Sequence, residues 1–156
     1  MDSVYQRRKA RAGPAEFIRE QHRRLIGILR RIDMTGDRLE RIELASTLSE
    51  EIREFIALEC EVLQPALDDA VPEQFSIAGA AHRRRGDLVA LAARLDVAAS
   101  RDEDPGQIVN RIFSTMVVHI GAAVREIMPC IERFPAASSE LLEARLRDLK
   151  EKMAEH

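Results

Sequence analysis

A glutamate lies where a helix of this chain would face a hydrophobic core. Glu59 is in line with Leu48, Ile52, Phe55 and Val62, at the four- and three-residue spacing of one buried helical face. An ionised carboxylate in such a place is costly unless a cation, a hydrogen-bond donor or a metal ion compensates it. The sequence therefore predicts a compensating group opposite Glu59.

Three histidines, each in a different helical segment, are candidates for that group. His22 and His119 fall within apolar stripes, and we place His82 inward as well, on a face that it shares with Ala78, Gly86, Val89 and Ala93. At about 1.5 Å of rise per residue, the distances to the nearest turns put these side chains at similar depths to Glu59. Imidazole and carboxylate groups suit iron, zinc or manganese, and bundles build metal sites from inward-pointing side chains. A metal site is one interpretation of this set.

Two interpretations without a metal remain open at this point. The histidines and Glu59 could form a hydrogen-bonded network, or Glu59 could pair with an inward arginine such as Arg85. Arg85 belongs to a run of three arginines, residues 83 to 85, that is more typical of a solvated helix face.

Long amphipathic segments with short connections must position these side chains. Gly13 and Pro14 fit the start of a helix over 14–33, and Asp104 with Pro105 fits the start of another that ends near 134. The second helix could begin at Asp37 or at Thr47, and the depth of His22 mildly favours Thr47. The remaining predicted helices run from Pro72 to Ser100 and from Ser138 or Ser139 nearly to the C-terminus.

Composition supports a helical fold in one domain. The 156 residues are 46% hydrophobic, 33% charged and 4% aromatic, without tryptophan, which favours helices over sheets. We expect an all-α protein: an antiparallel up-and-down four-helix bundle over 14–134, a basic flexible tail over 1–13 and an additional helix within 135–156. A net charge of −3 gives no reason to expect nucleic acid.

The same sequence predicts a soluble cytoplasmic protein. No stretch is expected to reach the roughly 20 apolar residues that span a bilayer, so we expect no membrane contact. The two cysteines lie in separate helical segments without zinc-finger spacing, which is typical of reduced thiols.

Four stretches together resemble the hemerythrin family, in its bacterial HHE cation-binding branch, over roughly residues 14 to 134. They are IREQHRRLIGIL around His22, FIALECEVLQPAL around Glu59, AHRRRGDLVALAARL around His82 and HIGAAVREIMP from His119. In that family, helices 1 and 3 each supply a histidine. Helices 2 and 4 each supply a histidine, a glutamate four residues later and a proline ten residues after the histidine. These ligands hold a non-haem di-iron centre, so the resemblance implies that the four named residues are metal ligands.

The sequence departs from the family pattern at two positions. Phe55 stands where the helix-2 histidine belongs, and Ala123 stands where the helix-4 glutamate belongs. The two half-motifs align at an offset of 64 residues, which also places Pro65 over Pro129. Each half has therefore kept one ligand and lost the other, which favours one iron ion over two.

Two functions follow as expectations. The first is a hemerythrin-like module that binds non-haem iron, with zinc or manganese as further candidates, and senses dioxygen, nitric oxide, peroxide or iron. The second is a metal-free bundle of the same fold that works as a protein interaction or regulatory module. An enzymatic role is less favoured, because no acid or base can be nominated beside an open coordination position. A homodimer through the C-terminal helix is a further expectation.

Overall fold

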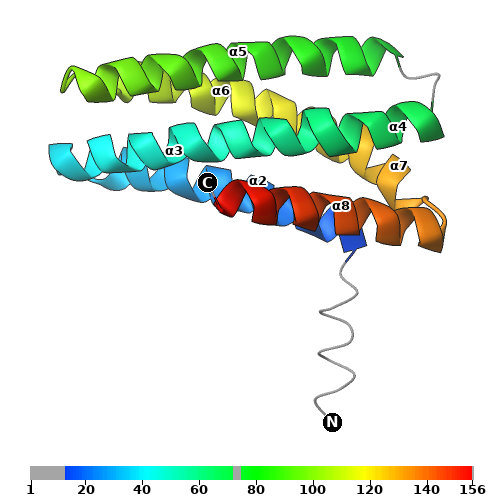
Figure 1. Ribbon diagram of the computed structural model, residues 1–156. Helices are drawn as coiled ribbons and strands as arrows, with labels where there is room; N and C mark the ends of the chain where they lie inside the picture. Colours follow the sequence, from blue (N-terminus) through cyan, green and yellow to red (C-terminus); the bar gives the residue numbers. More distant parts are fainter. Residues whose placement is uncertain (1–12, 72–74, 156) are drawn as a thin grey trace.

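The structure is a computed structural model that describes residues 13–71 and 75–155 (Figure 1). Its α-helices are α2 (Gly13–Met34), α3 (Arg38–Leu58), α4 (Gln64–Ala70), α5 (Phe75–Ser100), α6 (Gly106–Ala122), α7 (Met128–Glu132) and α8 (Ala136–Ala154). Short π-helical segments, η1 (Glu59–Leu63) and η2 (Ala123–Ile127), join α3 to α4 and α6 to α7. No strand occurs among the described residues. The all-α prediction and the up-and-down bundle with an extra helix are confirmed.

Aspartate side chains bind backbone N–H groups at the start of two bundle helices. Asp37 caps α3, with its carboxylate accepting a hydrogen bond of 3.0 Å from the backbone N–H of Leu39. Asp104 accepts a hydrogen bond of 2.9 Å from the backbone N–H of Gly106, at the start of α6. Both contacts satisfy backbone donors that the first helical turn leaves free. Of the two predicted starts for the second helix, Asp37 is therefore correct and Thr47 is wrong.

Two further predictions concern chain segments near the ends of helices. The last helix begins at Ala136 after Pro135, so the predicted caps Ser138 and Ser139 lie inside it. Proline's restricted backbone sets this boundary, since Pro135 is extended with ψ 151° and has no N–H to continue a preceding helix. The predicted start at Pro72 and the basic tail, apart from Gly13, lie outside the described residues.

A π turn interrupts the α3–α4 run and the α6–α7 run, shortly before a proline in each case. The N–H of Gln64 bonds to the carbonyl of Glu59, and the N–H of Met128 bonds to that of Ala123, five residues back in each case. Proline has no N–H and its ring collides with the carbonyl four residues earlier, so one extra residue per turn relieves the clash. The two π turns lie 64 residues apart, which is the offset of the two half-motifs.

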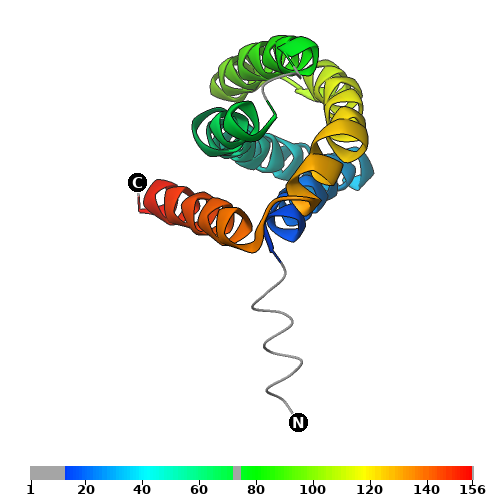
Figure 2. The same ribbon diagram turned by 90° about the vertical axis from the view of Figure 1, so that its right-hand side faces the viewer.

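The core consists of two apolar clusters. The larger one lies among the four bundle helices and includes Leu25, Leu48, Ile52, Leu88, Leu95, Ile112 and Met116. The second joins α8 to the end of the bundle and includes Phe17, Ile18, Leu63, Ile127, Leu142 and Leu146. Seen end-on, α8 lies outside the four helices and next to α2 (Figure 2). Its apolar side is thus buried within the chain.

One helical run is more apolar than the sequence analysis allowed. The helical run Gly106–Glu132 is long and apolar enough to cross a membrane by length and composition alone. The expectation that no stretch approaches this length is therefore wrong. Only about a third of this apolar stretch is buried, including Ile112, Met116 and His119, and length and composition alone are weak evidence for a membrane span.

Candidate functional site

Three of the four predicted site residues lie inside the bundle. His22, Glu59 and His119 are 5%, 3% and 1% exposed, on α2, at the start of η1 and on α6. Their helical spacing predicted this inward placement. A carboxylate and two imidazoles are therefore held in the core, where each must find a partner or pay for desolvation.

The fourth residue, His82, is exposed, so its predicted inward placement is wrong. The inward stripe of α5 consists of Ala81, Arg85, Leu88, Ala92 and Leu95, one residue before the stripe predicted from His82. A shift of one residue turns a side chain by about 100° around a helix. Leu88 and Leu95 explain why this stripe is buried and the predicted one is not. Burying these two leucines removes more apolar surface from water than burying Gly86 and Val89 would.

His119 hydrogen-bonds to Glu59 in a defined tautomer. Its Nε2 atom lies 2.8 Å from each carboxylate oxygen of Glu59, and its Nδ1 atom lies 3.0 Å from Nε of Arg84. The Arg84 guanidinium can only donate, so Nδ1 of His119 accepts and carries no proton. The ring proton is therefore on Nε2, which donates to Glu59.

Arg85 supplies the positive charge that Glu59 needs. Its guanidinium lies 3.5 Å from Oε2 of Glu59 and 3.4 Å from the side-chain oxygen of Gln64, and the arginine is 6% exposed. Both oxygens accept hydrogen bonds from arginine nitrogens. This is the arginine pairing that the sequence left open as an alternative to a metal site.

Phe55 lies between the two buried histidines. Its ring centroid is 5.6 Å from that of His22 and 5.8 Å from that of His119, with edge-on geometry in both contacts. Nε2 of His22 is buried and has no hydrogen-bond partner among the described residues. Burial lowers the pKa of His22 from 6.5 to about 4, although the nearby Glu59 carboxylate opposes this shift. His22 is therefore a neutral ring at neutral pH.

The described residues do not fit a hemerythrin-like metal centre as they are arranged. No three histidine, cysteine, aspartate or glutamate side chains of the described chain are grouped closely enough to hold a metal ion. Nε2 of His119 presents a proton to Glu59 instead of a lone pair, and reversing the tautomer would set an N–H against the N–H of Arg84. Arg85 also occupies one side of the carboxylate that would ligate a metal.

The sequence did not predict two residues of this cluster, Arg84 and Gln64. Arg84 lies next to the inward stripe of α5, and its side chain contacts His119. Gln64 is the residue whose N–H bonds to the carbonyl of Glu59 in the π turn. Arg85 could have been preferred over His82 from the leucines at its spacing. Gln64 carried no such signal, because the π turn changes which residues share a face.

The comparisons with known proteins found nothing similar: no family model, curated protein or solved structure matches this chain. The resemblance to hemerythrin therefore stays a prediction that rests on the quoted motifs.

Proposed function

We propose that this protein is a metal-independent helical-bundle binding module, in which a buried arginine compensates the glutamate that a metal ion would otherwise compensate. The observation that carries the proposal is the contact between Arg85 and Glu59, at 3.5 Å within the core. The proton on Nε2 of His119 and the ring of Phe55 support it, since both obstruct coordination.

An outward-facing apolar surface supports a binding role. Phe113, Val117, Val118 and Val124, on α6 and η2, are between 44% and 57% exposed. Phe113, Val117 and Val124 follow one another at spacings of four and seven residues, which places them along one side of the helical run. Grouped exposed apolar side chains are typical of surfaces that contact another molecule, whereas single ones need no explanation.

Metal analysis of the full-length protein tests the proposal. The chain would be produced in media supplemented with iron, zinc or manganese, and its metal content and thermal unfolding would be measured with and without EDTA. We expect far less than one ion per chain and the same melting temperature in both conditions. A stoichiometric ion that EDTA removes, with a fall in melting temperature and loss of the ion in Glu59→Gln, would overturn the proposal.

A mononuclear metal-binding or sensing protein is the second candidate, and one observation favours it. Nε2 of His22 is buried without a hydrogen-bond partner among the described residues, and the charges of Glu59 and His119 influence this ring. Histidine and carboxylate are ligands that suit iron, zinc or manganese, but the three side chains would have to move closer together to share an ion. This function requires Arg85 to leave Glu59 and the proton to leave Nε2 of His119. Any response to dioxygen, nitric oxide or peroxide would depend on that metal.

A further inference from the structure

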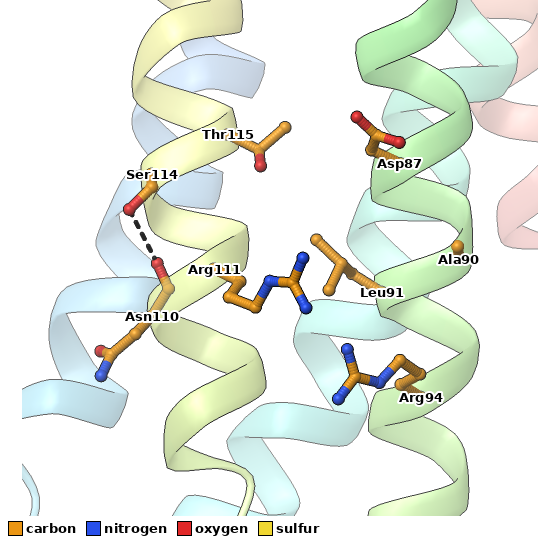
Figure 3. A pocket seen from close by; sticks show the side chains of 8 residues that line it. All are labelled: Asp87, Ala90, Leu91, Arg94, Asn110, Arg111, Ser114 and Thr115. Atoms are coloured by element: carbon orange, nitrogen blue, oxygen red, sulfur yellow. Dashed lines mark hydrogen bonds between the residues drawn. The ribbon is translucent and has the colours of Figure 1, made fainter.

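A groove of about 460 Å³ lies between α5 and α6, outside the buried Glu59 cluster. Arg94 on α5 and Arg111 on α6 both line it, and both are exposed. Figure 3 shows their guanidinium groups extending into the groove from opposite walls. Two positive groups are therefore held toward each other across one cleft.

Neither arginine has an ion-pair partner in the described parts of the chain. Some arginines of the surface do, since Arg19 pairs with Glu132 and Arg53 with Asp96, whereas others such as Arg145 have no such partner among the described residues. What distinguishes Arg94 and Arg111 is that they face each other across one groove. Like charges that face each other repel, and water only reduces this repulsion. An anion between the two guanidinium groups would add two attractions that offset this repulsion.

The other polar groups of the groove set the shape of the ligand. The Ser114 hydroxyl donates to the backbone carbonyl of Asn110 at 3.1 Å, so its proton is already used. Thr115 and Asp87 lie farther along the groove on opposite walls (Figure 3). Asp87 is seven residues from Arg94 on α5, about 10 Å at the usual helical rise. Its carboxylate disfavours negative charge at that end.

We infer that the α5–α6 groove binds a small oxyanion, a carboxylate or a phosphate group, between Arg94 and Arg111. The planar guanidinium matches either group with paired hydrogen bonds, and such charge-assisted bonds are stronger than those between neutral groups. The rest of the ligand lies toward Asp87 and Thr115 and is neutral or positively charged there. The groove volume is within the range of small-molecule sites.

Titration of the full-length protein with two separate anions, at constant ionic strength held with sodium chloride, tests this inference. Inorganic phosphate and succinate would be added while the arginine Nε–H signals are followed by NMR. We expect saturable shifts at Arg94 and Arg111 with at least one anion. Saturation with phosphate alone assigns the site to phosphate groups, and saturation with succinate alone assigns it to carboxylates.

Matched variants separate specific binding from general charge attraction. Arg94→Gln and Arg111→Gln are each expected to weaken binding about tenfold, because each removes one charge-assisted contact. Asp87→Asn is expected to strengthen it about twofold by removing the opposing charge. Arg145→Gln, on α8, removes an exposed arginine with no ion pair among the described residues and should change nothing.

Two results would overturn the inference: no saturable shift with either anion, or an equal loss in Arg145→Gln and Arg94→Gln. The second would show that the anions respond only to net charge. The groove is separate from the buried cluster, so either result would leave the proposed metal-free core untouched. Conversely, metal in the core would not by itself contradict anion binding in the groove.

Discussion

The guanidinium of Arg85 lies 3.5 Å from the carboxylate of Glu59, and both side chains are less than a tenth exposed. Removing one partner of a buried ion pair leaves an uncompensated charge and typically costs about 3 to 5 kcal/mol. Arg85→Met is therefore expected to lower the free energy of unfolding by about that amount, as measured by urea denaturation.

A double-mutant cycle isolates the pair itself. Glu59→Gln alone should also destabilise, and the combined Glu59→Gln/Arg85→Met variant should lose clearly less than the sum of the two single changes. Arg19→Met provides the control, since its exposed pairing with Glu132 should contribute no more than about 1 kcal/mol. Additive losses in the cycle would contradict a direct Arg85–Glu59 interaction.

Stability is expected to fall on acidification through the titration of His22. The folded pKa is about 4, below the usual 6.5, so between these values the unfolded state binds a proton that the folded state does not. The free energy of unfolding therefore has its full value above about pH 6.5 and falls as the pH is lowered toward 4. The difference between the unfolded and folded pKa values of His22 corresponds to a loss of about 3 kcal/mol. Urea denaturation across this range should show the loss in the wild type, and His22→Leu should show a loss smaller by that amount.

Phe55 and Arg85 are the two side chains whose removal should permit metal binding. Phe55→His/Arg85→Ala would add an imidazole beside His22 and His119 and free the Glu59 carboxylate. Stoichiometric uptake of zinc or cobalt is expected by calorimetry, with cobalt giving visible absorption. Phe55→Leu/Arg85→Ala is the matched control and should bind neither ion. A folded double variant that takes up no metal would show that the helices cannot bring the donors together.

Helix α8 should behave as part of the core. Leu146 is 1% exposed within the second apolar cluster, whereas Leu141 on the same helix is 52% exposed. Leu146→Ala is expected to cost about 2 to 5 kcal/mol of stability, and Leu141→Ala about 0.5 kcal/mol or less. Equal, small losses would mean that α8 packs only loosely, and light scattering on both variants would show whether either change alters a dimer.

The helical fold followed from the sequence because its signals are local and agree with one another. Apolar residues repeat at helical spacing, and Asp104 with Pro105 marks a helix start that the structure bears out through the contact to Gly106. The choice between Asp37 and Thr47 was harder. Both match the same capping pattern, and the structure places the cap at Asp37, whose carboxylate accepts a hydrogen bond from the N–H of Leu39.

The candidate site was harder to predict because it depends on rotations of about 100°. His82 and Arg85 both fit helical stripes, and the stripe with larger leucines is the buried one. His82 was predicted to face inward because histidine is a common metal ligand, whereas a buried arginine is rare. The sequence therefore predicted the chemical type of the group that compensates Glu59, a cation or a hydrogen-bond donor, more readily than the residue that supplies it.

Each of the two π turns contains one residue more than an α-helical turn, so the number of residues there matters. Because a π turn holds about one more residue than an α-helical turn, deleting one residue from Glu59–Leu63 would restore regular α-helical bonding with little rotation between the two flanking segments. It would, however, bring the ring of Pro65 against the carbonyl four residues earlier, a clash that the π turn now avoids. Insertions should therefore be tolerated at 35–36, in the connection before the Asp37 cap, and deletions should not be tolerated at the π turns, where the extra residue makes room for the proline.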